Sequence, residues 1–131
     1  MIPHEGKWDN AGIWTEAANR NEPLFAAITD STPLPDNISK SLINITGTGF
    51  EVSSVTVTGN DLLVRFFNAE GDNKPKTISF DCKPDKVELV ELNGNSAELL
   101  KMTNDKNRRT KINLSMPRFG IRTIKLFNVV N

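Results

Sequence analysis

The sequence has very few of the residues that build metal sites and disulfide bonds. Its 131 residues include one cysteine, Cys82, and one histidine, His4. A single cysteine cannot form an internal disulfide, so the redox compartment stays open. A structural zinc site takes four cysteine or histidine ligands, which this chain does not have. A Ser-His-Asp triad would have to use His4 at the extreme N-terminus, where chains are usually poorly ordered, so we do not expect one.

Net charge and long apolar runs are also absent. Sixteen lysines and arginines balance sixteen aspartates and glutamates. Without a strong basic field, we expect neither nucleic acid nor an anionic membrane as a partner. The apolar runs span only a few residues, so no transmembrane helix is expected, and no signal-peptide pattern is visible. We expect a soluble protein of the cytoplasm or the periplasm, and the residues do not decide between the two.

The composition supports one globular domain. Hydrophobic residues make up 37% of the chain and charged residues 24%, which is ordinary for a folded domain. A chain of this size buries roughly two thirds of its unfolded surface, so it can hold a core without metal or disulfides. We expect a single domain over 1–131, with an irregular N-terminal segment over 1–49 and a strand-rich body over 50–131.

The N-terminal segment shows little regular pattern. Residues 11–19 can form a short helix with Asn10 as its N-cap. Residues 24–29 are typical of a short strand, and 30–40 form a loop rich in Ser, Thr, Pro and Asp.

The body shows one strand pattern after another. The break in alternation between Val52 and Val55 predicts a β-bulge. The segment 61–69 is apolar on both faces, which favours a central strand covered on both sides. Asn93-Gly94 predicts a hairpin turn. Strands are expected over 51–58, 61–69, 77–82, 87–92, 98–102, 111–116 and 121–130.

These patterns predict an all-β fold, an antiparallel β-sandwich of about seven to eight strands with one short helix. There is no alternation of strands and helices, so a parallel sheet is not expected. The residues expected in the core are Leu62, Val64, Phe66, Ile78, Phe80, Leu89, Ile112, Leu114, Ile124 and Leu126.

Candidate functional residues gather near the N-terminus. His4 and Glu5 could contribute to a polar site, and Trp8 could stack on a sugar ring through its apolar face. Trp8 and Trp14 together could form a sugar-binding platform. Indoles more often anchor a loop on a sandwich, and the absence of tyrosine weakens the sugar-binding interpretation.

Arg65 lies in the middle of an apolar strand pattern. A buried arginine needs a carboxylate or several carbonyl partners. The alternative is an arginine whose stem packs on the sheet while its guanidinium reaches water. Among the carboxylates, nothing in the spacing marks the pair that a glycosidase uses.

Several segments form a pattern along the chain, namely 3–8, 16–18, 21–24, 62–68 with 70–71, 90–94 and 119–126. In this order they resemble the C-terminal end of the glycoside hydrolase family 38 alpha-mannosidases. That family has a PHEG-W segment, an N-x-PL turn, an LVLRFYE-like strand and a terminal F-E-I-x-T-I-x-L strand. Two departures stand out, because Asn68 and Gly120 occupy positions where the family often has Glu.

The resemblance implies a supporting role. Family members are retaining enzymes that depend on a metal, generally zinc, and their catalytic residues and ligands lie in an N-terminal region that this chain lacks. We therefore expect an excised, non-catalytic C-terminal β domain with no cofactor of its own. Its partners would be the catalytic domains of the same polypeptide and mannose-containing glycans, with His4, Glu5, Trp8, Trp14 and Arg65 as cleft or interdomain contacts.

Two other functions stay open. The chain could be an independent carbohydrate-binding module that uses Trp8 and Trp14. It could also be a purely structural assembly domain without a ligand.

Overall fold

A computed structural model describes residues 3–8, 11–22, 41–70, 72–104 and 109–129. The chain divides into two compact units, Met1–Ser41 and Leu42–Asn131. The single-domain interpretation stays a prediction, and each unit is described by itself. The predicted strand over 24–29 and the loop over 30–40 lie outside the described residues.

The first unit contains the helix α1, Ile13–Asn21. It begins two residues later than predicted, because Gly12 takes the N-cap position with a positive φ of 66° and offers no side-chain cap. The predicted cap, Asn10, lies outside the described residues. Glu16 and Arg20 form an ion pair of 2.8 Å one turn apart, which favours the helix. No residue of α1 is buried.

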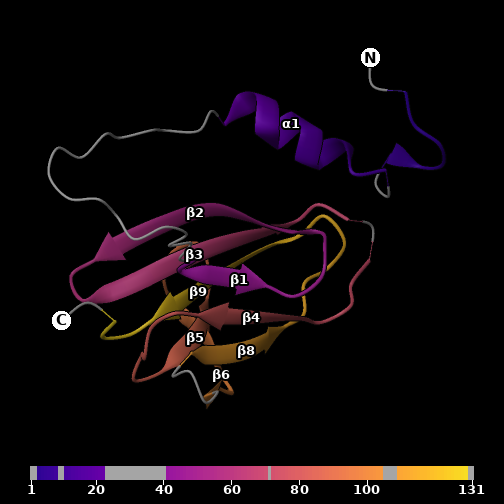
Figure 1. Cartoon of the computed structure of the whole chain (residues 1–131). Helices are drawn as coiled ribbons and strands as arrows, with labels where there is room; N and C mark the ends of the chain where they lie inside the picture. The colour runs from indigo at the N-terminus through magenta and orange to yellow at the C-terminus, as the bar shows by residue number, and fades with distance from the viewer. Residues whose placement is uncertain (1–2, 9–10, 23–40, 71, 105–108, 130–131) are drawn as a thin grey trace, which may run out of the picture. The chain divides into compact units, whose positions relative to one another are not determined.

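The second unit is a sandwich of two antiparallel sheets (Figure 1), as the sequence predicted. One sheet has the order β1-β4-β8-β7 and the other β2-β3-β9-β5-β6. The strands within the described residues are β1 Ile43–Ile45, β2 Phe50–Thr58, β3 Asp61–Asn68, β4 Lys76–Phe80, β5 Val87–Val90, β6 Ser96–Leu100, β7 Thr103–Asn104, β8 Thr110–Leu114 and β9 Ile121–Leu126.

The hairpin of β2 and β3 follows the predicted pattern. The register shifts between Val52 and Ser54, which is the predicted bulge. The bulge keeps Val52 and Val55 on one face although they are three residues apart. In the second hairpin, Gly94 has a φ of 88°, and its N–H donates to the carbonyl of Glu91 at 2.9 Å between β5 and β6.

β3 is a central strand, as predicted, but the prediction that both of its faces are covered is wrong. Its burial alternates strictly, so Leu62, Val64 and Phe66 are buried while Leu63 and Phe67 are only half-buried. The four-stranded sheet covers one face of β3, and no second layer covers the other face within the described part of the strand-rich unit.

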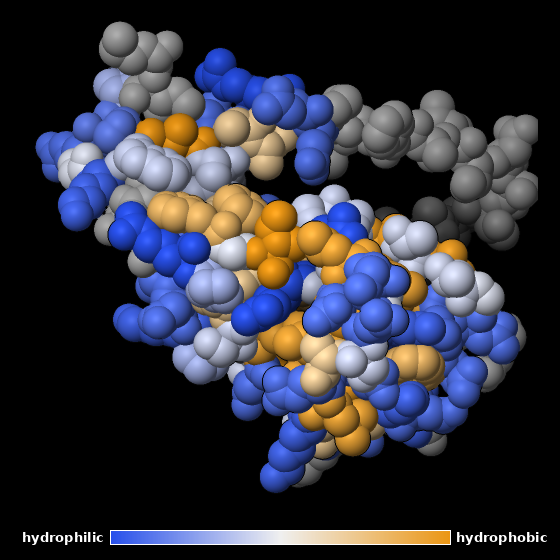
Figure 2. Space-filling view, turned by 180° about the vertical axis from the view of Figure 1, so that it is seen from behind, coloured by the Kyte–Doolittle hydropathy of each residue, from blue (hydrophilic) through white to orange (hydrophobic). Residues whose placement is uncertain are grey.

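The core lies between the two sheets. All of the predicted core residues are buried except Leu89, which is half-buried and packs at the margin of the core. Met116 and Val87 are also fully buried. Hydrophobic residues also reach the molecular surface, between hydrophilic ones (Figure 2).

Two short edge strands were not predicted. β1 lies in the segment expected to be irregular, and pairing with β4 holds it. β7 has two residues and pairs with β8. The last strand, β9, ends at Leu126 rather than Val130, because Asn128 has a positive φ of 55° that breaks the extended backbone.

The core predicts the cost of shortening Phe66, whose side chain is fully buried on β3. Phe66→Ala should lower the free energy of unfolding by about 3–5 kcal/mol, because it removes apolar contacts and leaves a cavity. Urea denaturation of both proteins measures this difference.

The matched control is Phe67→Ala, which changes the half-buried neighbour on the opposite face of β3. We expect a clearly smaller loss there. Equal losses in the free energy of unfolding for the two variants would contradict this assignment, because they would show that both faces of β3 are buried alike.

Candidate functional site

The predicted site residues fall into two groups in two units. His4, Glu5 and Trp8 are exposed in the first unit, with 58% of Trp8 accessible to solvent. Trp14 lies half-buried in α1, and its indole N–H is buried without a hydrogen-bond partner in the described structure. Arg65 lies in the sandwich. The five residues are therefore described separately in the two units.

Arg65 lies on the outer face of the five-stranded sheet, which faces away from the core. Its Nε donates to Thr123 Oγ1 on the adjacent β9 at 3.2 Å. No carboxylate among the described residues is within ion-pair distance of it. Arg65 is half-buried, which agrees better with a stem packed on the sheet than with a buried ion pair.

Arg65 has both apolar and polar neighbours on this outer face, with Ser54 on β2 and Thr123 on β9 directly opposite it. Leu63 and Phe67 flank it on β3, and Ile121 lies opposite Phe67 on β9 with 53% of its surface exposed. The guanidinium of Arg65 therefore has apolar neighbours along β3 and hydroxyl neighbours across the strands. Such a guanidinium is suited to bind a carboxylate in a bidentate manner.

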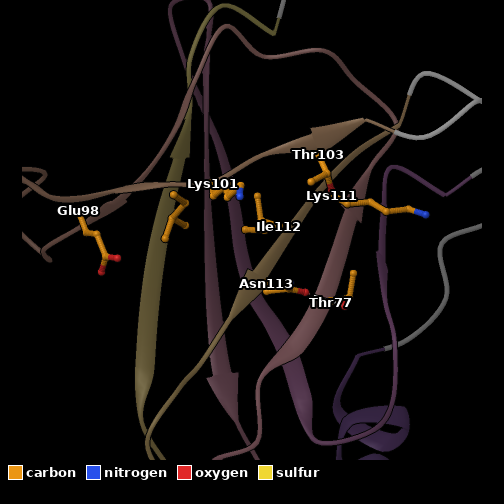
Figure 3. A pocket seen from close by; sticks show the side chains of 8 residues that line it. Thr77, Glu98, Lys101, Thr103, Lys111, Ile112 and Asn113 are labelled. Atoms are coloured by element: carbon orange, nitrogen blue, oxygen red, sulfur yellow. Dashed lines mark hydrogen bonds between the residues drawn. The ribbon is translucent and has the colours of Figure 1, made fainter.

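A polar hollow of about 530 Å³ lies beside β8, with which the two-residue strand β7 pairs only at Thr110 and Lys111 (Figure 3). Thr77 on β4 donates to Asn113 Oδ1 on β8 at 2.8 Å, which leaves the amide N–H groups of Asn113 as donors. The close-up shows Glu98 at the far end, apart from the other side chains. The hollow is lined by Thr77, Glu98, Leu100, Lys101, Thr103, Lys111, Ile112 and Asn113.

A second hollow of about 350 Å³ shares Glu98, Leu100 and Asn113 with the first. The two form one groove on the side of the sandwich where β6 and β8 lie. Hydroxyl, amide and ammonium groups can hydrogen-bond a polar ligand there. The lining has no aromatic ring on which a sugar could stack.

Asn68 is the buried polar residue whose role the sequence did not predict. It ends β3 and is fully buried. Its Oδ1 accepts the N–H of Glu70 at 3.2 Å. Its Nδ2 donates to the carbonyl oxygens of Asp72, Met116 and Pro117, at 2.5, 3.4 and 3.2 Å. The amide therefore ties the end of β3 to two loops.

Gly120 lies against Asn68. The backbone N–H of Asn68 donates to the carbonyl of Gly120 at 2.9 Å. A Cβ atom at position 120 would stand 2.5 Å from the Cγ of Pro117 and 2.9 Å from its carbonyl oxygen. Only glycine fits this turn without movement of Pro117.

The fold and the family signal agree. The family model described as the glycosyl hydrolases family 38 C-terminal beta sandwich domain matches residues 44–124, which include the strands β2 to β8, the last two residues of β1 and the first four of β9. The chain belongs to this family. Comparison with curated proteins and with solved structures gave no match.

In this family 38 domain, both departures from the expected pattern meet at one place. The resemblance suggested Glu where Asn68 and Gly120 stand. Three carbonyl oxygens surround the Asn68 amide, so the pocket requires a hydrogen-bond donor, and an ionised carboxylate offers none. At Gly120 there is no room for a side chain. Each departure therefore suits the local structure of this chain.

The described part of the family 38 domain offers no metal centre. No three His, Cys, Asp or Glu side chains come close enough together there to hold an ion. A catalytic zinc takes about three protein ligands. These residues therefore do not fit the zinc ion that the resemblance implies for the parent enzyme. Within the same described residues, no helix has both the length and the apolar character needed to span a bilayer.

Among the described residues of the domain, three ionisable groups have shifted pKa values. A hydrogen bond from Lys125 and the backbone N–H of Asn128 lower the pKa of Asp61, because they favour its charged form. Hydrogen bonds from Lys86 and Ser96 lower the pKa of Glu88. Burial raises the pKa of the Cys82 thiol, so Cys82 is a poor candidate for a reactive nucleophile.

The contacts of Asn68 predict a large effect of Asn68→Asp. A carboxylate at this position would be buried against carbonyl oxygens. We therefore expect the free energy of unfolding to fall by at least about 3 kcal/mol at pH 7. The aspartate pKa should be raised, because burial and the carbonyls disfavour the charged form. Part of the loss should therefore be recovered as the pH falls and the carboxyl group becomes protonated.

Urea midpoints at pH 7 and pH 5 for the wild type and the variant measure this effect. The exposed Asn44→Asp on β1 is the control and should change stability little. A small loss for Asn68→Asp, or one that grows as the pH falls, would contradict the assigned role.

Proposed function

We propose that this chain is a non-catalytic supporting domain of an alpha-mannosidase-like glycoside hydrolase. The match to a family 38 C-terminal β-sandwich domain over residues 44–124 carries the proposal. The catalytic domains of the same polypeptide are its proposed partner. The sandwich supplies a rigid body, and the surface of that body is held against the catalytic part.

The outer face around Arg65 is the proposed contact surface. Protein interfaces are enriched in arginine and apolar side chains at their centre. Here Leu63 and Phe67 flank Arg65 along β3, and Ile121 lies opposite Phe67. A carboxylate on the catalytic part would complete the hydrogen bonds that Thr123 leaves open.

The N-terminal loop is the proposed contribution to the substrate cleft. His4, Glu5 and Trp8 are exposed, so their side chains are available to a neighbouring domain or to a mannose-containing glycan. Loops held by a rigid scaffold commonly carry such contacts. Trp14, which is half-buried in α1, is the proposed anchor of α1 on the partner.

The chemical step is proposed to lie outside this chain. Retaining hydrolysis needs two carboxyl groups about 5 Å apart, one as nucleophile and one as acid/base. The parent enzyme would supply that pair together with its zinc ion. This chain would hold the catalytic part of the parent enzyme in position and would itself transfer no proton.

The second candidate is an independent carbohydrate-binding module. The exposed ring of Trp8 favours it, because an indole face can stack on a sugar. A glycan-array signal for the isolated chain that is lost when Trp8 and Trp14 are changed to alanine would support it. No signal, together with docking to a catalytic part, would favour the supporting role.

The proposed function predicts that the isolated chain neither hydrolyses alpha-mannosides nor retains zinc. Turnover of an aryl alpha-mannoside in the presence of zinc, and metal content after dialysis, measure the two properties. A heat-inactivated sample is the control. Turnover well above that control, or one zinc ion retained per chain, would overturn the non-catalytic role.

The supporting role predicts that Arg65→Ala has different effects in two settings. In the isolated chain the change removes one hydrogen bond to Thr123, so the free energy of unfolding should fall by about 1 kcal/mol or less. In a longer family 38 enzyme that contains this domain, the same change should lower the melting temperature of the whole enzyme further, because it also breaks the proposed contact.

The exposed Arg122→Ala is the matched control, because Arg122 lines the groove on the other side of the sheet. We expect it to act equally in both settings. Equal effects of Arg65→Ala in the isolated chain and in the longer enzyme would exclude the Arg65 face as the contact.

A further inference from the structure

The core-facing side of β2 is left uncovered along most of its length. Phe50, at its start, is buried, but Val52, Val55 and Val57 are 37%, 47% and 58% exposed. Exposure therefore rises along the strand. The in-register neighbours of these valines on the same face of β3 are buried; they are Phe66, Val64 and Leu62.

The opposite sheet is too short to cover these valines. Its edge strand β1 has three residues, whereas β2 has nine. The chain passes from Ile45 to Phe50 through only four residues, and Gly47 and Gly49 in this link both have positive φ. A Cβ at Gly49 would stand 2.7 Å from the Glu70 side chain. The link thus joins the two sheets only at the Phe50 end of β2.

The backbone edge of β2 is also open. β2 pairs with β3 on one side, and no other strand pairs with it within the described residues. Monomeric proteins usually protect such an edge with lysine, proline or inward-pointing charges. β2 contains no proline or lysine, and its one charged residue, Glu51, precedes the bulge. The regular, uncharged stretch is 54–58.

We propose that this edge pairs with the same edge of a second copy of the chain. Residues 54–58 read Ser-Val-Thr-Val-Thr, which is nearly the same in both directions. Antiparallel pairing about a two-fold axis at Thr56 places Val55 of one copy opposite Val57 of the other. Directly opposite residues share one face of a sheet, so the valines of both copies meet on the core side.

The remaining residues fit the same register. Thr56 lies opposite Thr56 of the second copy, and Ser54 lies opposite Thr58 of the second copy. Hydroxyl side chains therefore meet on the outer face, where Thr–Thr and Thr–Ser pairs are favourable. Glu51 lies outside the paired stretch. A net charge of zero removes long-range repulsion between the copies. The pairing uses one edge per copy, so it closes as a dimer.

Sedimentation velocity of the full 131-residue chain over a wide concentration range tests this proposal. The wild type should show a monomer–dimer equilibrium. Val55→Lys should weaken self-association at least about tenfold, since it places a charge among the apposed valines. Val55 is already exposed, so the fold should survive, and circular dichroism with the urea midpoint confirms this for each variant.

The control is Leu99→Lys on β6, the opposite edge of the same sheet, where Leu99 is 67% exposed. It should leave the dimer intact. A chain that is monomeric at every concentration overturns the proposal and leaves the valines to another domain of a longer protein. A dimer that Val55→Lys does not weaken, or assembly beyond the dimer, also overturns it.

Cross-linking tests the register itself. With Cys82 changed to serine, Thr56→Cys should join two copies through a short thiol-reactive linker, because the two Cβ atoms lie about 5 Å apart in such a pair. Ser54→Cys should cross-link far less. In this register the residues 54 of the two copies are offset by four positions along the strands, which is about 13 Å. Equal cross-linking of the two variants would overturn the register.

Discussion

The sandwich depends on one buried amide, that of Asn68. The connection over 69–75 carries the chain from β3 in one sheet to β4 in the other, and the connection over 115–120 carries it back from β8 to β9. The Asn68 side chain hydrogen-bonds to both connections. Two of the crossings at this end of the sandwich are therefore held by one residue. Because the amide is fully buried, these bonds are not weakened by competition with water.

The same residue explains why its position departs from the family pattern. Its surroundings present oxygen acceptors, and only a donor satisfies them. Gly120 completes the arrangement, because its carbonyl accepts the Asn68 N–H and its lack of a side chain lets the turn close on Pro117. The two departures are one local solution rather than two unrelated changes.

The sequence was sufficient to predict the long strands and the core, because strict alternation such as that of β3 reflects burial on one face. It could not predict β1 or β7, because strands of three and two residues carry no periodicity and exist through pairing with β4 and β8. It overestimated the cover on Leu63 and Phe67, because an apolar residue in a strand does not reveal whether a second layer is present. Arg65 was noticed as an anomaly in a pattern, whereas the contacts of Asn68 depend on loops distant in sequence and leave no local signal.

The place of β9 has a consequence for the order of folding. β9 is the last strand in the sequence, yet it lies between β3 and β5 inside its sheet. The hairpins on either side of it, β2–β3 and β5–β6, have no direct contact through the sheet until β9 arrives. During synthesis the chain emerges from its N-terminus, so this sheet cannot close before residues 121–126 have left the ribosome. Until then both hairpins have unpaired edges, and the closing contacts join segments far apart in the sequence, which slows folding.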